Sequence, residues 1–132
     1  YGFVHYDNPL PVVAAIVERG PKVVLVRSRG WPEGMYGLVT GFLERGESPE
    51  DGVLREVREE LGLEGTVSSL VGAYTFEMRN ELIVAYHVVA AEGPITVGEE
   101  LEGFKEVPTE KLRPWPFGTG HAVRDWLARR GG

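Results

Sequence analysis

The sequence contains no cysteine, which excludes disulfide bonds, thiolate metal sites and cysteine nucleophiles. Long hydrophobic runs are also missing, since the longest purely apolar run covers only residues 12–17, whereas a membrane-spanning helix needs about 20 apolar residues. No secretion leader begins the sequence, so we expect a cytoplasmic protein without a membrane partner. It starts at Tyr1 rather than Met, which suggests a trimmed or partial chain.

Positive charge is scarce, because 14 Lys and Arg stand against 20 Asp and Glu, giving a formal net charge of -6. A surface of this sign repels a phosphate backbone, so we expect no nucleic-acid partner. The same surface would repel a small phosphorylated substrate unless a cation were concentrated locally. A bound metal ion is the obvious candidate for that cation.

The order of hydrophobic runs and turn residues predicts one mixed α/β domain over residues 1–132. The hydrophobic fraction of 42% and the charged fraction of 26% are typical of globular proteins. Gly20 and Pro21 separate two apolar runs and predict a hairpin, and an acidic loop is expected at 98–103. Strands are predicted at 12–18, 22–28, 37–40, 67–76, 82–91 and 104–107, and helices between Ser48 and Gly62 and at 118–129.

The first of these helices has clear signals at both ends. Ser48 is a good N-cap, Pro49 suits the first turn, and Asp51 lies three residues after the cap. Gly62 is a plausible stop. At 100° per residue, one side of this helix is apolar and is predicted to be buried through Val53, Leu54, Val57 and Leu61.

Glu56, Glu59 and Glu60 lie together on an arc beside this apolar side, because they are spaced i, i+3 and i+4. Two like charges about 4 Å apart repel by about 4 kcal/mol at an effective dielectric near 20. A hard cation reverses that cost, and Mg²⁺ commonly joins carboxylates to substrate phosphates. Arg55 also supports the group, four residues before Glu59. An isolated cluster of this kind is usually a solvated acidic face, so the flanking residues decide.

The flanking residues complete a longer pattern. Gly41 is followed by Glu47, and then by the run 55–63, which reads Arg-Glu-Val-Arg-Glu-Glu-Leu-Gly-Leu. Every specified position of G-x5-E-x7-R-E-U-x-E-E-x-G-U, where U is aliphatic, is present. At about 7% usage per residue, a chance match arises at roughly one start site in a billion. The chain therefore resembles the Nudix hydrolases, whose box has this pattern.

This resemblance implies an α/β/α sandwich, in which a mixed β-sheet lies between helices and the box forms a loop-helix-loop metal site. In the family, the glutamates matching Glu56, Glu59 and Glu60 bind Mg²⁺ or Mn²⁺. The glycine matching Gly41 offers its carbonyl to the metal. The residues matching Glu47 and Arg55 help hold the site together, and we count them with the catalytic group.

The reaction implied by the resemblance is attack of water, activated by metal, on phosphorus in a nucleoside diphosphate linked to another group. A nucleoside monophosphate and a second phosphorylated piece would result. Some Nudix enzymes take the general base from a late loop and others from the box. Glu99, Glu100 and Glu102 occupy the late loop here, and we favour Glu100. An exposed acidic turn is an equally good interpretation of these three residues.

Residues 41–47, Gly-Phe-Leu-Glu-Arg-Gly-Glu, resemble the G-F-[VL]-E-x-G-E of NADH-pyrophosphatase-like members. Several of these relatives carry a zinc ribbon, but without cysteine we expect no zinc here. Residues 113–117 partly resemble their Q-P-W-P-F-P element but lie much farther past the box. We interpret 113–117 as a Pro-rich connection that anchors Trp115 in the core. The favoured small-molecule substrates are dinucleotides such as NADH or FAD, and ADP-ribose.

Substrate-contact candidates are aromatic and basic residues near the metal loop. Each has a core or surface interpretation that is at least as good. The candidates for stacking on a base are Trp31, Tyr36 and Phe76, and those for holding phosphates or a ribose edge are Arg27, Arg29 and Arg79.

Two other functions stay open. The first is hydrolysis of oxidised or non-standard nucleoside triphosphates. The second is a Nudix module that binds a nucleotide without cutting it. Such modules typically lose glutamates from the box, and all are retained here, which favours an enzyme. Family members often dimerise, so we also expect a homodimer.

Overall fold

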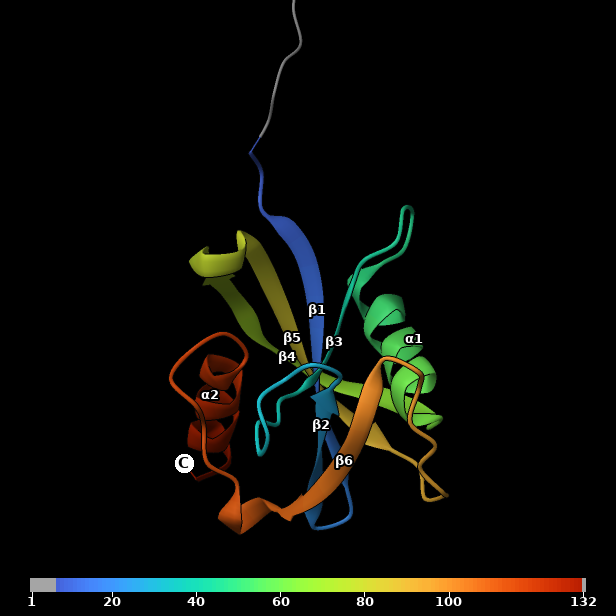
Figure 1. The fold of residues 1–132 in the computed structure, drawn as a ribbon. Coiled ribbons are helices and arrows are strands. Elements are labelled where there is room, and N and C mark those ends of the chain that lie inside the picture. The colour runs from blue at the N-terminus through green and yellow to red at the C-terminus, as the bar shows by residue number, and fades with distance from the viewer. Residues whose placement is uncertain (1–6, 132) are drawn as a thin grey trace, which may run out of the picture.

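A computed structural model describes residues 7–131 and places a mixed β-sheet between two helices (Figure 1). The main path of the sheet runs β4-β5-β1-β2-β6, and β3 pairs with β1 beside this path. Only the β1–β5 pairing is parallel in this part of the chain. The expected α/β/α sandwich is thereby confirmed. The elements are β1 Leu10–Arg19, β2 Lys22–Ser28, β3 Val39–Phe42, α1 Pro49–Leu61, β4 Gly65–Phe76, β5 Glu81–Ala90, β6 Leu101–Pro108 and α2 Gly120–Gly131, with single 3-10 turns at Glu77–Arg79 and Thr109–Lys111.

Strand β1 lies at the centre and supplies both cores. Its residues alternate between the two faces of the sheet, as the two-residue period of a strand requires. Val13, Ala15 and Val17 join the core under α1, whereas Ala14 and Ile16 join the core under α2. The two helices therefore cover opposite faces, and Figure 1 shows them on either side of the sheet.

The predicted ends of α1 are confirmed. The Ser48 side chain accepts a hydrogen bond from the backbone N–H of Asp51 at 3.2 Å. Gly62 adopts the left-handed conformation with φ 68° and donates its N–H to the Arg58 carbonyl, which ends the helix. Val53, Val57 and Leu61 are fully buried and Leu54 packs against them, as the apolar side predicted.

The second helix is also close to its prediction. Ala122, Val123 and Trp126 are buried, and Leu127 packs at the edge of the same core. No helix among residues 7–131 combines the length and the apolar character needed to cross a bilayer.

Two predictions near the box were wrong in detail. The strand expected at 37–40 lies at Val39–Phe42, because β1 pairs Val13 with Gly41 and so draws Gly41 into the sheet. The acidic loop expected at 98–103 ends earlier, because Leu101 begins β6 and pairs with Ser28 across a register shift in β2.

Candidate active site

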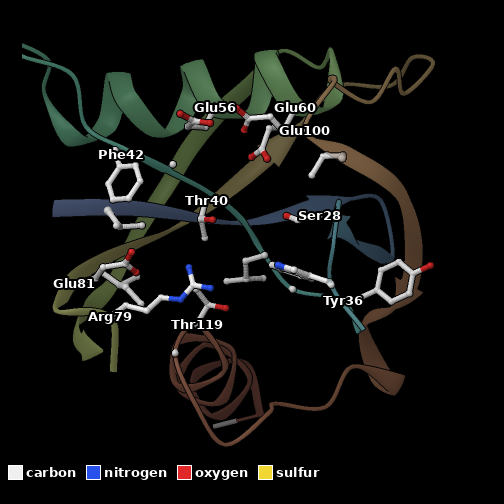
Figure 2. Close-up of a pocket in the computed structure, with 18 of the residues that line it drawn as sticks. Ser28, Tyr36, Thr40, Phe42, Glu56, Glu60, Arg79, Glu81, Glu100 and Thr119 are labelled. Carbon is white, nitrogen blue, oxygen red and sulfur yellow. The ribbon is translucent and has the colours of Figure 1, made fainter. Parts of the chain in front are cut away.

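A cavity of about 1180 Å³ opens beside the N-terminal half of β1 and the box helix. Its residues come from α1, the sheet, the loop before β3 and the segment ahead of α2 (Figure 2). The carboxylates of Glu56 and Glu60 form one wall, and Arg79 and Thr119 face them from the other side (Figure 2). A volume of this order suits a nucleotide-sized ligand.

Arg55 ties the box together from the first half of α1. It donates from Nε and Nη2 to the two oxygens of Glu47, at 2.7 and 3.0 Å. Its Nη1 donates to Glu56 at 2.8 Å and to Glu59 at 3.1 Å, and Nη2 also reaches the carbonyl of Phe42 at 3.1 Å. The guanidinium lowers the pKa of Glu47 to about 2, chiefly through this hydrogen bond. Glu47 thus holds Arg55 while also accepting the Glu44 backbone N–H at 3.0 Å, and Arg55 in turn positions Glu56 and Glu59.

Gly41 lets β3 approach α1 closely. A Cβ built at this position would lie 2.0 Å from Cδ and Oε2 of Glu56. Any side chain at position 41 would therefore displace the Glu56 carboxylate from its place. Burial raises the pKa of Glu56, and the Arg55 hydrogen bond opposes that rise.

Glu60 is the most deeply buried glutamate of the box. It is 9% exposed, and its Oε2 is buried without a hydrogen-bond partner among residues 7–131. Burial raises the pKa of Glu60 to about 8, and the nearby charges of Glu56 and Glu100 add to the rise. An acid in this position gains most from a cation that replaces its missing partner.

The loop before β6 brings Glu100 to this group. Its backbone docks on the end of α1, where Thr96 donates to the Leu61 carbonyl at 3.0 Å and Gly98 to the Glu60 carbonyl at 3.0 Å. Only glycine fits at 98, since a Cβ there would lie 2.7 Å from the Glu59 carbonyl oxygen. Glu100 then lies close to Glu60, as Figure 2 shows.

The other two acids expected in this region contact arginines, and Glu99 in the loop also lines the cavity, whereas Glu102 lies in β6. Glu102 pairs with Arg27, which holds the pKa of Glu102 below its usual range. The backbone carbonyl of Glu99 accepts a hydrogen bond from Arg29.

These residues fit a hard divalent cation. The donors are carboxylate oxygens, one of them buried and unpartnered, and their mutual repulsion calls for positive charge. Within residues 7–131, no three carboxylate or imidazole groups are already gathered as a closed metal site. Glu56, Glu59 and Glu60, with the Gly41 backbone beside Glu56, are the groups that would hold such a cation.

Four of the six substrate-contact candidates line the cavity. Trp31 and Tyr36 come from the loop before β3, Phe76 ends β4, and Arg79 comes from the turn between β4 and β5. One face of Tyr36 is covered by the ammonium of Lys105, 4.4 Å from the ring centroid.

The structure does not bring Arg27 and Arg29 to the cavity. Arg27 is bound to Glu102 and donates to the Trp31 carbonyl at 2.7 Å. Arg29 is turned toward the Glu99 carbonyl. Arg27 instead connects β2 to Glu102 of β6, and Arg29 connects the loop after β2 to the loop before β6.

Several residues that line the cavity were not predicted from the sequence. Trp115 packs against the core under α2, as expected, but it also lines the cavity together with Phe117 and Thr119. Glu81 lines the cavity too, although it is only 8% exposed. The partial likeness of residues 113–117 to a family element was the one signal that pointed to this segment, and its distance from the box had argued against it.

Comparison with known proteins agrees with the box and the fold. Residues 8–127 match the family described as NUDIX domain. The chain is 33% identical over 135 aligned positions to a protein of Pseudomonas aeruginosa named NAD-capped RNA hydrolase NudC. That alignment covers 99% of this chain and 49% of the relative. The chain thus spans about half the length of the curated relatives it matches.

Solved structures with the same fold come from several Nudix proteins. A NUDIX hydrolase from Nitrosomonas europaea superposes with a TM-score of 0.80 at 21% identity, covering 98% of this chain and 76% of the other. An ADP-ribose pyrophosphatase from Streptococcus suis gives 0.76 at 19% identity, with coverages of 95% and 94%. These likenesses concern the fold, and the family match rests on the sequence. The chain belongs to the Nudix family.

Proposed function

We propose that this chain hydrolyses a phosphoanhydride bond in a nucleoside diphosphate linked to another group, with Mg²⁺ or Mn²⁺ as cofactor. The observation that carries this proposal is the buried, unpartnered oxygen of Glu60 beside Glu56 and Glu100, at the edge of a nucleotide-sized cavity. The products are a nucleoside monophosphate and a second phosphorylated fragment.

Each box residue has a role in this proposal. Glu56, Glu59 and Glu60, with the Gly41 carbonyl, would hold the metal, which when bound neutralises phosphate charge and lowers the pKa of water. Arg55 and Glu47 keep these carboxylates in place. Glu100 accepts a proton from the attacking water as the new P–O bond forms and the anhydride P–O bond breaks.

The favoured substrates are dinucleotides such as NADH or FAD, and ADP-ribose. The Gly-Phe-Leu-Glu-Arg-Gly-Glu run at 41–47 and the relative named NAD-capped RNA hydrolase support this choice. Several aromatic side chains line the cavity, among them Trp31, Tyr36, Phe76 and Trp115. Aromatic rings in a cavity wall suit a substrate that carries planar ring systems.

A substrate panel tests the proposal. The protein is incubated with Mg²⁺ or Mn²⁺ and with NADH, FAD, ADP-ribose, a diadenosine polyphosphate, 8-oxo-dGTP or an NAD-capped RNA, with EDTA as control. We expect metal-dependent release of a nucleoside monophosphate from a dinucleotide or ADP-ribose, resolved by chromatography. Preference for 8-oxo-dGTP would move the chain to triphosphate hydrolysis, and no turnover at all would favour a non-catalytic binding module.

The same proposal includes a homodimer. Apolar side chains left exposed, such as Leu10, Phe42 and Met78, are compatible with a partner copy. Light scattering that returned the monomer mass would contradict this part of the proposal without touching the reaction.

Replacing Gly41 with Ala is expected to lower kcat by about a hundredfold, because the new methyl group displaces the Glu56 carboxylate. Gly103→Ala is the matched control, since a Cβ at 103 meets no atom within 4 Å. Steady-state rates of both variants with saturating Mg²⁺ check the prediction. Equal rates for the two variants would mean that the position of Glu56 is not critical.

A further inference from the structure

Glu81 places a carboxyl group where the sheet pattern calls for an apolar side chain. It begins β5, opposite Leu10 of β1 and Phe76 of β4. Ile83 and Ala85, which follow it at two-residue spacing, belong to the core under α2. Glu81 faces the same side and is 8% exposed, but its side chain lies at the mouth of that core and lines the cavity (Figure 2).

This carboxyl group has no partner within the described part of the chain. No hydrogen bond or ion pair joins it to any of residues 7–131, although Arg79 lies two residues earlier and lines the same cavity. Although the residue is 8% exposed, its carboxylate oxygens are not closed off and reach the space of the cavity. An unpaired carboxylate in a cavity wall is available to accept hydrogen bonds from donors on a ligand.

Glu81 lies too far from the box to join the metal carboxylates. It sits opposite Leu10 in the β1–β5 ladder, whereas Gly41 sits opposite Val13 in the β1–β3 ladder. The backbones of Glu81 and Gly41 are therefore two strand spacings apart across the sheet and three residues apart along β1, which together make roughly 14 Å. In a bound nucleoside diphosphate, the part that reaches Glu81 is therefore a sugar or base beyond the phosphates.

We propose that Glu81 is a specificity-determining residue that accepts hydrogen bonds from the adjacent hydroxyl groups of a substrate ribose. Two neighbouring hydroxyl donors match the two oxygens of one carboxylate, which only accepts hydrogen bonds when ionised. Carboxylates bind the ribose of dinucleotides in this manner in other folds. Thr40 and Thr119 add hydroxyl groups to the same cavity (Figure 2). This inference rests on the proposed dinucleotide or ADP-ribose substrate.

Glu81→Gln tests the assignment, because it keeps the shape of the side chain but exchanges one acceptor oxygen for a donor. With NADH as substrate we expect KM to rise about tenfold or more while kcat stays near wild type. Glu77→Gln, at an exposed residue of the turn before β5 and outside the cavity lining, is the matched control and is expected to leave both constants unchanged. Thermal melting of both variants verifies that they fold.

Two analogues of NADH identify the ribose, one with 2′-deoxyribose on the adenosine half and one with it on the nicotinamide half. Wild-type protein is expected to lose affinity for one analogue, and Glu81→Gln is expected to show no further loss with that analogue. An effect of Glu81→Gln that persists undiminished with both analogues would overturn the ribose assignment and point to a donor on a base.

The role of Glu81 can be tested independently of whether the protein hydrolyses NADH. Calorimetric binding of NADH in EDTA gives a dissociation constant for wild type and for Glu81→Gln without any turnover. Equal dissociation constants, or an unchanged KM, would overturn the role of Glu81 even if NADH is hydrolysed. A weaker binding by the variant would support that role even if hydrolysis were absent and the proposed function failed.

Discussion

Replacing Glu60 with Gln is expected to lower kcat by about a thousandfold or more with Mg²⁺. Glu60 presents a buried oxygen that no group among residues 7–131 satisfies, so a divalent cation is its natural partner. Gln keeps the shape but removes the charge, and a metal contributes several kcal/mol of transition-state stabilisation, about a thousandfold in rate. Metal-dependent turnover of the substrate chosen by the panel is the measurement.

The control for this substitution is Glu64→Gln, an exposed acid just past the box that does not line the cavity. It is expected to keep wild-type rates, which separates the loss of one ligand from a general loss of negative charge. Glu59→Gln is expected to behave like Glu60→Gln. Turnover near wild type in either box variant would show that the metal-site assignment is wrong.

In the absence of divalent metal, the free energy of unfolding is expected to fall as pH rises from about 5 to about 8. Burial raises the pKa of Glu60 from 4.5 to about 8, so the folded protein keeps a proton that the unfolded chain releases. The stability from this group is fully present below pH about 4.5 and is lost as pH approaches about 8. The loss is up to about 5 kcal/mol.

Urea unfolding at several pH values in EDTA measures this dependence. Glu60→Gln is expected to flatten the curve over the same interval, because it removes the titrating group. Saturating Mg²⁺ is expected to restore stability most strongly at pH 8, where the deprotonated carboxylate binds a cation best. An equal slope in wild type and Glu60→Gln would locate the pH dependence in another group.

Local signals account for what could be predicted without the structure. The Ser48 cap, the Gly62 stop and the spacing of Val53, Val57 and Leu61 each act within a few residues, so α1 was predicted closely. The box was recognised for the same reason, since its spacing is fixed along one helix and its entry loop. The hairpin of β1 and β2 followed from the turn at 20–21.

Features that depend on strand pairing could not be predicted in this way. Gly41 was expected just past the strand at 37–40, but its pairing with Val13 places it in β3. Arg27 was expected within a strand and Arg29 just after it. Their partners, however, are Glu102 in β6 and the Glu99 carbonyl in the loop before β6, and these contacts hold both arginines outside the cavity. These outcomes depend on which segments meet across the sheet, and residue spacing along the chain carries no information on that.

The sequence by itself determined the family, the box carboxylates and the ends of the helix that carries them, because each depends on short-range spacing and capping. Only the tertiary structure decided which remote groups meet that helix. The docking of the loop at Gly98 brings Glu100 to Glu60, and the parallel pairing of β1 with β5 buries Glu81 in the cavity wall. The physical reason is that burial, and the pKa of a buried acid, depend on neighbours brought together by long-range packing.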